Sequence, residues 1–140
     1  LKNKYDDLIF ENYVPGKEIQ VANIGNKAIG AIELKPKRKF YDYHAKYKKS
    51  SKTQHIMPAN ISKKKYSEVL KISKKANKIL NCKGITRCDF RFHEGKFYLL
   101  EVNTQPGMTS LSLVPEIAEY NKISFTTLVK WMVNDAGLNR

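Results

Sequence analysis

Along the first third of the chain, short apolar runs alternate with turn residues, a pattern typical of β-strands. Strands are predicted at residues 6–14, 18–24 and 28–34. A long polar stretch without a regular period follows, from 36 to 60, and is expected to be irregular. The chain is therefore predicted to build part of a sheet before its first helix.

The pattern then changes to helical spacing. Ser62 precedes a segment that runs to Leu80, and a serine there is well suited to cap the first turn of a helix. The apolar residues of this segment are spaced as on one face of a helix, and we expect them to be buried as a stripe: Tyr66, Val69, Leu70, Ala76, Ile79 and Leu80.

Residues 84–103 are predicted to form a β-hairpin. Two β-rich runs flank His93–Lys96, in which Gly95 can adopt a positive φ. Opposed residues of a hairpin share a face, so Asp89 and Glu101 meet only if the loop has an odd number of residues or a bulge intervenes. A three-residue loop that ends at Gly95 meets this condition.

After the hairpin, the pattern predicts a turn rich in Gly, Pro and Thr, a short helix near 112–120, and a last helix from about Ser124 to Asp135 that is stopped by Gly137. Strands in one sheet with helices packed against it make an α+β fold with a mainly antiparallel sheet. At 140 residues, the chain is long enough for one domain with a modest core.

The predicted hairpin carries hard oxygen ligands on one face. Side chains two positions apart on a strand point the same way, so Glu101 lies beside Asn103 and Arg87 beside Asp89. The carboxylate and amide oxygens of Asp89, Glu101 and Asn103 suit Mg²⁺, which leaves positions for phosphate and water. The alternative is a solvated hairpin face whose acidic residues hold no ligand.

The turn after the hairpin could meet an oxyanion. Gly107 permits close approach of the backbone to a ligand, and Pro106 ends regular strand pairing. Two structural alternatives stay open. Arg87 could form a salt bridge at the edge of the core, and Thr109, Ser110 and Ser112 could cap the next helix.

The net charge of +13 comes almost entirely from the first part of the chain. Residues 1–80 hold 19 Lys and Arg against 7 Asp and Glu, whereas residues 81–140 hold 7 against 6. Such an excess brings in a basic RNA-binding module as an alternative, because clustered cations neutralise backbone phosphates. Many of the lysines fall on the predicted helix, however, where they can form a solvated face. A nucleotide polyphosphate also favours positive potential.

Other sequence features restrict the class of protein. There is no apolar run of about 18 residues, no signal peptide and no initiator methionine, so we expect a soluble chain that is part of something longer. Cys82 and Cys88 lack the spacing of a zinc site, and we expect both to be reduced thiols in the core.

Four ordered motifs cover nearly the whole chain: ENYVPGKE at Glu11–Glu18, FYDYHAKY at Phe40–Tyr47, TRCD at Thr86–Asp89, and LLEVNTQPGMT at Leu99–Thr109 followed by SLVP at Ser112–Pro115. In this order and spacing, they resemble the C-terminal half of bacterial D-alanine:D-alanine ligases of the ATP-grasp superfamily. The resemblance implies that residues 1–140 are the C-terminal portion of an ATP-grasp domain, with the N-terminal domain and part of the central domain absent.

The resemblance also implies ligands for several residues. Those that would hold ATP are Glu11, Tyr13, Val14, Glu18, Phe40, Lys46 and Leu100. Two Mg²⁺ or Mn²⁺ ions are expected, on Asp89, Glu101 and Asn103. The residues expected around the acyl centre and the second substrate are Arg87, the Gly107 amide, Tyr47, Ser112 and Leu113. Tyr47 favours a dipeptide product over a depsipeptide.

The activity implied by the resemblance is ATP-dependent ligation of two D-alanines through an acyl phosphate, in the synthesis of peptidoglycan precursors. Its partners would be D-alanine, ATP, the missing N-terminal part and a second copy in a homodimer in the bacterial cytoplasm, with no nucleic acid or membrane. We expect the chain alone not to form the dipeptide. Another ATP-grasp ligase that joins a different acid or amine remains the nearer alternative.

Overall fold

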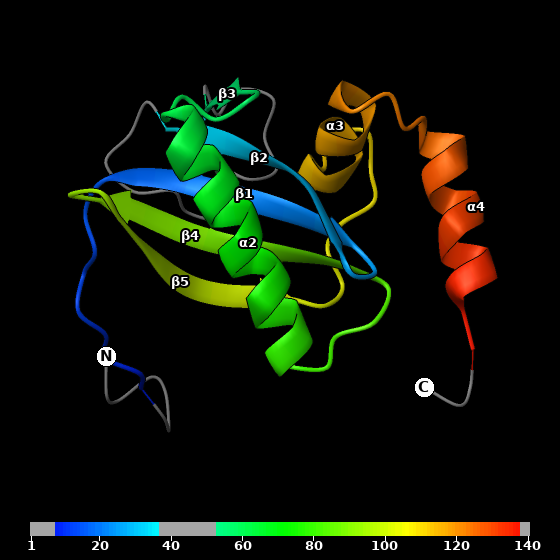
Figure 1. The fold of residues 1–140 in the computed structure, drawn as a ribbon, viewed down its shortest axis with the longest axis horizontal. Coiled ribbons are helices and arrows are strands. Elements are labelled where there is room, and N and C mark those ends of the chain that lie inside the picture. Colours follow the sequence, from blue (N-terminus) through cyan, green and yellow to red (C-terminus); the bar gives the residue numbers. More distant parts are fainter. Residues whose placement is uncertain (1–7, 37–52, 138–140) are drawn as a thin grey trace.

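The computed structural model of the chain describes residues 8–36 and 53–137, where five strands form one sheet in the order β3-β2-β1-β4-β5 (Figure 1). All neighbouring strands are antiparallel. The strands are β1 (Lys17–Ile24), β2 (Lys27–Lys35), β3 (Gln54–Ile56), β4 (Ile85–His93) and β5 (Lys96–Asn103). The helices are α2 (Lys63–Ile79), α3 (Leu113–Tyr120) and α4 (Phe125–Asp135). The predicted α+β class with a mainly antiparallel sheet is confirmed.

Helix α2 crosses one face of the sheet (Figure 1). The Ser62 hydroxyl caps it as predicted and accepts a hydrogen bond from the Lys65 backbone N–H at 3.3 Å. Strands β1, β2 and β4 and helix α2 contribute one apolar cluster to this face: Ile19, Val21, Ala31, Val69, Cys88 and Phe90.

The inner face of α2 differs from the predicted apolar stripe. Ile79 and Leu80 are 70% and 59% exposed, so the prediction that they are buried is wrong. The last turn of α2 runs past the edge of the sheet, where no strand can cover it (Figure 1). The buried residues of the helix are Val69, Ser73 and Asn77.

Buried polar groups join α2 to the sheet. Asn23 Nδ2 donates to Ser73 Oγ at 2.9 Å and to Thr86 Oγ1 at 3.2 Å, and Ser73 Oγ donates back to Asn23 Oδ1 at 3.0 Å. Thr86 Oγ1 in turn donates to Asn77 Oδ1 at 2.8 Å. These bonds offset the cost of burying the polar side chains beside an apolar cluster.

Both cysteines are free. Cys88 is fully buried next to the polar groups that join α2 to the sheet, and burial raises the pKa of its thiol, which favours the protonated form. Cys82 is only partly buried, so the prediction of a core thiol is confirmed for Cys88 alone.

Helices α3 and α4 pack at one end of the opposite face of the sheet (Figure 1). A second apolar cluster lies there and consists of Ala22, Ile32, Leu34, Ile85, Leu113, Val114, Ile117, Ala118 and Leu128. The predicted bounds of both helices hold to within one residue. The rest of this face carries polar side chains from β1, β4 and β5, described below.

The β4–β5 hairpin turns through two residues. Glu94 and Gly95 have φ values of 48° and 75°, and His93 pairs with Lys96, so the predicted three-residue loop is wrong. The register then shifts between Asp89 and Phe90. This shift is a β-bulge, the other arrangement that the sequence analysis allowed, and it places Asp89 opposite Glu101.

Two further strand predictions need correction. Residues 8–14, the described part of the predicted strand at 6–14, form no strand, and Ile9 and Phe10 are exposed. The predicted irregular stretch at 36–60 contains the short strand β3, which pairs with the end of β2.

The described residues include no helix that is both long and apolar enough to span a membrane.

Candidate functional site

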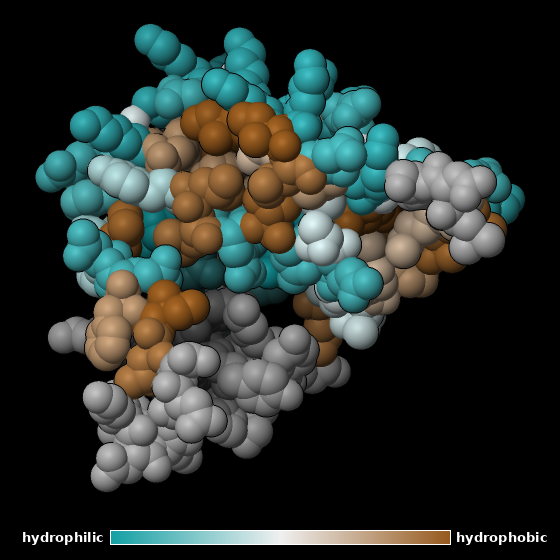
Figure 2. Space-filling view, turned by 90° about the horizontal axis from the view of Figure 1, so that it is seen from below, coloured by the Kyte–Doolittle hydropathy of each residue, from teal (hydrophilic) through white to brown (hydrophobic). Residues whose placement is uncertain are grey.

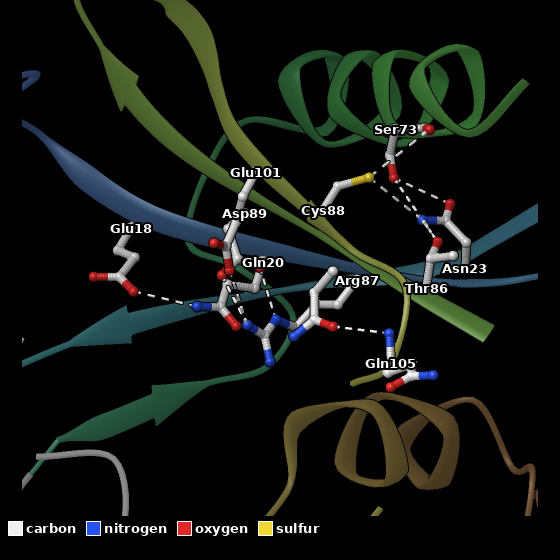
Figure 3. Close-up of polar contacts among 11 residues, drawn as sticks. Glu18, Gln20, Asn23, Ser73, Thr86, Arg87, Cys88, Asp89, Glu101 and Gln105 are labelled. Atoms are coloured by element: carbon white, nitrogen blue, oxygen red, sulfur yellow. Dashed lines mark hydrogen bonds and ion pairs between the residues drawn. The ribbon is translucent and has the colours of Figure 1, made fainter. Parts of the chain in front are cut away.

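A row of polar side chains crosses the face of the sheet opposite α2. The strand register aligns Glu18 with Arg91, Gln20 with Asp89, and Ala22 with Arg87. On the other side of β4, it aligns Asp89 with Glu101 and Arg87 with Asn103. Residues directly opposite each other share a face, so three strands present their acidic, amide and guanidinium groups together (Figure 3).

An ion pair lies at the centre of this row. Arg87 Nε donates to Asp89 Oδ1 at 2.7 Å, and Arg87 Nη2 donates to Asp89 Oδ2 at 2.9 Å. The same Nη2 lies 3.6 Å from Glu101 Oε1. Asp89 is only 8% exposed, whereas the Glu101 side chain is open to solvent. The guanidinium thus contacts both carboxylates that the sequence predicted as metal ligands.

Asn103 ends β5 beside the turn that follows. Its Oδ1 accepts a hydrogen bond from the Gln105 backbone N–H at 2.9 Å (Figure 3). Further along, Gly107 lies so close to Ser112 that a Cβ added to the glycine would be 2.9 Å from Ser112 Oγ. The glycine therefore leaves room for the Ser112 hydroxyl, and approach of the Gly107 backbone to a ligand stays a prediction.

Ser112 is the N-cap residue of α3 but makes no capping bond with its side chain. Its Oγ accepts from the Thr109 backbone N–H at 3.0 Å and lies 2.9 Å from Thr109 Oγ1. Leu113 is 8% exposed and belongs to the core, so only its backbone N–H could contact a ligand. The first N–H groups of a helix favour anions, including carboxylates.

The segment before β1 is held against β4 by Arg91. Arg91 Nε donates to the Val14 carbonyl at 2.9 Å, and Nη2 donates to the Tyr13 hydroxyl at 3.2 Å. Its Nη1 also lies 3.7 Å from Glu18 Oε2. Gly16, with φ of 102°, directly precedes the start of β1 at Lys17. Three of the predicted nucleotide-binding residues therefore contact one guanidinium.

Two residues of the row were not predicted. Arg91 follows Asp89 at the period of two, which is the signal that could have identified it. Gln20 follows Glu18 in the same way; it is 1% exposed, and its Nε2 donates to Glu18 Oε1 at 3.2 Å. Its Oε1 is buried and has no hydrogen-bond partner among the described residues. An orphaned acceptor is uncommon and often marks a ligand site.

The remaining predicted residues are spread more widely. Phe40, Lys46 and Tyr47 lie outside the described residues. Glu11 lies in the exposed segment before β1. Leu100 is the extra residue of the β5 bulge and has no partner residue on β4. The alternation of side chains between the two faces of a strand is therefore interrupted at Leu100, whose side chain is exposed.

The donor set favours a hard cation bound together with other ligands. No group of three or more His, Cys, Asp and Glu side chains in the described part of the chain is placed to hold a metal. A cation here would use the carboxylates of Asp89 and Glu101 and the amide of Asn103. Mg²⁺ or Mn²⁺ can bind to this small number of protein ligands when phosphate and water oxygens complete its coordination.

Known proteins with similar sequences are D-alanine–D-alanine ligases. The chain is 56% identical over 136 residues to a D-alanine–D-alanine ligase of Pelagibacter ubique, a match that covers 97% of this chain and 45% of the relative. It is 42% identical to the ligase of Paramagnetospirillum magneticum, with 94% and 45% covered. The chain thus spans about half the length of these relatives.

Solved structures share the fold. A D-alanine–D-alanine ligase from Bacillus anthracis complexed with ATP superimposes with a TM-score of 0.75 at 31% identity, over 89% of this chain and 41% of that one. The VanG D-Ala:D-Ser ligase of Enterococcus faecalis has a TM-score of 0.74 at 26% identity, over 87% of this chain and 36% of that one.

The family model for the D-ala D-ala ligase C-terminus matches residues 2–134. That range includes all four sequence motifs and every strand of the sheet. Family model, relatives and fold agree, and the chain belongs to the D-ala D-ala ligase C-terminus family.

Proposed function

We propose that the protein to which this chain belongs joins two D-alanines at the expense of ATP, giving D-alanyl-D-alanine for peptidoglycan. The observation that carries the proposal is the alignment of Asp89 and Glu101 across β4 and β5, with Arg87 between them. Opposed carboxylates beside a fixed cation suit a reaction in which a phosphoryl group is transferred to a carboxylate.

We propose that Asp89, Glu101 and Asn103 hold Mg²⁺ or Mn²⁺, with two ions as the expected number. The metal, when bound, offsets the negative charge of the transferred phosphoryl group. The sheet supplies rigidity here, because Asp89 is buried and two of the three ligand residues pair directly with β4. Fixed ligands make positioning the main contribution to catalysis.

The nucleotide would lie toward the start of β1. Glu18 would bind the ribose hydroxyls, Tyr13 and Val14 would lie at the adenine edge, and Glu11 would meet the adenine amino group. Support for this comes from Arg91, which holds the Val14 carbonyl and the Tyr13 hydroxyl beside Glu18. Apolar contact with the adenine is assigned to Leu100 and Phe40, and contact with the phosphates to Lys46.

The second D-alanine would bind near the start of α3. Its carboxylate would meet the Ser112 hydroxyl and the Leu113 N–H, since the Leu113 side chain is part of the core. Arg87 and the Gly107 amide would stabilise the tetrahedral centre, a role in which one donor typically contributes about 3 kcal/mol. Tyr47 would lie next to this substrate.

Calorimetry of ATP binding with and without Mg²⁺ tests the metal site. The variant combines Asp89→Asn with Glu101→Gln, and the matched control combines Glu68→Gln on α2 with Glu119→Gln on α3. Mg²⁺-dependent binding that persists in the control and is lost in the variant would support the proposal. In the full-length protein, unchanged dipeptide formation by the variant would refute the assignment.

A ligase with a different second substrate is the remaining candidate, because the neighbour from Enterococcus faecalis is a D-Ala:D-Ser ligase. Product analysis with D-alanine, D-serine and D-lactate in equal amounts separates these cases. We expect D-alanyl-D-alanine as the main product of the full-length protein, and we expect that protein to be a homodimer of the bacterial cytoplasm, as light scattering and fractionation would show.

A further inference from the structure

The predicted metal ligands already have a cationic partner in this structure. Both oxygens of Asp89 accept a hydrogen bond from Arg87, at 2.7 and 2.9 Å. The same guanidinium lies 3.6 Å from Glu101. The Arg87 and Asp89 side chains are 13% and 11% exposed, so water screens this pair only weakly.

A second cation at these carboxylates would meet strong repulsion. Arginine keeps its charge at any pH a protein tolerates, so the guanidinium cannot become neutral when a metal approaches. A divalent ion that bridged Asp89 and Glu101 would lie within a few ångströms of it. Either the guanidinium must move away, or anionic groups must enter with the metal.

From this geometry we propose that Arg87 is the resident counter-ion of Asp89 and Glu101, and that it excludes a bare divalent cation from the site. The metal then enters only as its complex with a polyphosphate, whose oxygens compensate the added charge and offer the guanidinium a bidentate partner. This inference rests on the proposed function for the metal site and adds an order of binding to it.

The test measures Mn²⁺ alone, without nucleotide, through the loss of the free Mn²⁺ signal in electron paramagnetic resonance. Arg87→Met removes the counter-ion and should bind Mn²⁺ at least tenfold more tightly than the unchanged chain. Arg91→Met is the matched control, because it removes the same charge from the same face of the sheet and leaves the Arg87–Asp89 pair in place. Its affinity should stay within about twofold of the unchanged chain.

Two further variants keep the test decisive. Arg87→Lys retains the charge, so it should stay closer to the unchanged chain than to Arg87→Met. Arg87→Gln, which preserves hydrogen bonding, replaces Arg87→Met if circular dichroism shows that the latter does not fold. The inference would be overturned if the unchanged chain and Arg87→Met bound Mn²⁺ with equal affinity, or if neither bound it. It would also be overturned if Arg91→Met gained as much Mn²⁺ affinity as Arg87→Met. Because no nucleotide is present, these outcomes are independent of the calorimetric test of ATP binding.

Discussion

At the scale of single residues, Asn23 and Gln20 show two ways of burying an amide on the same strand. Asn23 Nδ2 donates to Ser73 and Thr86, and Asn23 Oδ1 accepts from Ser73. Gln20 Oε1, on the opposite face, has no hydrogen-bond partner within residues 8–36 and 53–137. A satisfied buried amide stabilises its surroundings, whereas an orphaned acceptor has lost its water without compensation.

Replacing these two amides should therefore have unequal effects. Asn23→Leu leaves the buried Ser73 hydroxyl without its Asn23 partner, whereas Thr86 keeps its bond to Asn77. We expect the free energy of unfolding to fall by about 3 kcal/mol. Gln20→Met, which removes the orphaned oxygen and keeps a similar shape, should change it by less than about 1 kcal/mol. Urea denaturation followed by circular dichroism compares them, and equal losses would contradict this description of the buried amides.

At the scale of elements, two turns use glycine for different reasons. Gly16 has φ of 102°, and an added Cβ would lie 2.2 Å from the Phe92 carbonyl oxygen. Gly95 has φ of 75°, and an added Cβ would meet nothing within 4 Å. Only the first turn is thus restricted by packing as well as by its backbone conformation.

Alanine substitution should separate the two turns. Gly95→Ala carries the cost of a left-handed backbone alone, about 1 kcal/mol. Gly16→Ala must also displace β4 or the segment before β1, so its loss of stability should be at least twice as large. Thermal unfolding of both variants measures the difference, and a smaller loss for Gly16→Ala would show that this segment is free to move away from β4.

A pH-dependent contact joins β3 to α3. His55 Nδ1 lies 2.7 Å from Glu116 Oε2, and this hydrogen bond raises the pKa of His55 above its ordinary value of 6.5, against the opposing effect of burial. The protonated pair therefore contributes its full stabilisation below pH 6.5 and loses it as the pH rises through the raised pKa of the folded state.

Glu116→Gln should lower the melting temperature below pH 6.5 and have little effect well above the raised pKa of His55. Glu119→Gln, which removes an exposed acid from the same helix, controls for the change in charge. Differential scanning calorimetry, from below pH 6.5 to well above the raised pKa of His55, measures the melting temperatures of the two variants. A difference between the two variants that does not depend on pH would exclude His55 titration as its cause.

The same elements show how far the sequence was informative. Alternation along β4 and β5 correctly placed Asp89 and Glu101 on one face, but local pattern could not distinguish a bulge from a longer loop. Helical spacing located α2 and its cap. Helical spacing could not show that the last turn of α2 extends past the edge of the sheet, because the position of that edge depends on which strands pair. Gln20 and Arg91 follow Glu18 and Asp89 at the strand period of two, but which residues they lie opposite was known only once β1 was paired with β4.

At the scale of the whole molecule, apolar side chains remain exposed over the edge strand β5 and the end of α2 (Figure 2). They include Ile79, Leu80, Leu99 and Leu100. A second exposed apolar group, Ile9 and Phe10, precedes β1. The relatives are more than twice as long as the part that this chain matches, so in them further polypeptide accompanies the same domain.

We predict that the 140-residue chain alone does not form D-alanyl-D-alanine. We assign the metal ligands and the second-substrate contacts to this chain, and none of its residues is assigned to the first D-alanine. Mass spectrometry of the products formed from ATP and D-alanine, with the full-length protein as positive control, makes the comparison. Dipeptide formed by the chain alone would sink this division of roles.

The bulge in β5 makes the hairpin tolerant to one change in chain length. Leu99 lies opposite Phe90, and Glu101 lies opposite Asp89. Leu100, between Leu99 and Glu101, therefore has no partner residue on β4. A deletion of Leu100 would leave both pairs aligned, whereas an inserted residue elsewhere in β5 would rotate Glu101 toward the core. The chain can therefore lose one residue at this point without losing the carboxylate pair, although the apolar contact proposed between Leu100 and the adenine would be lost with it.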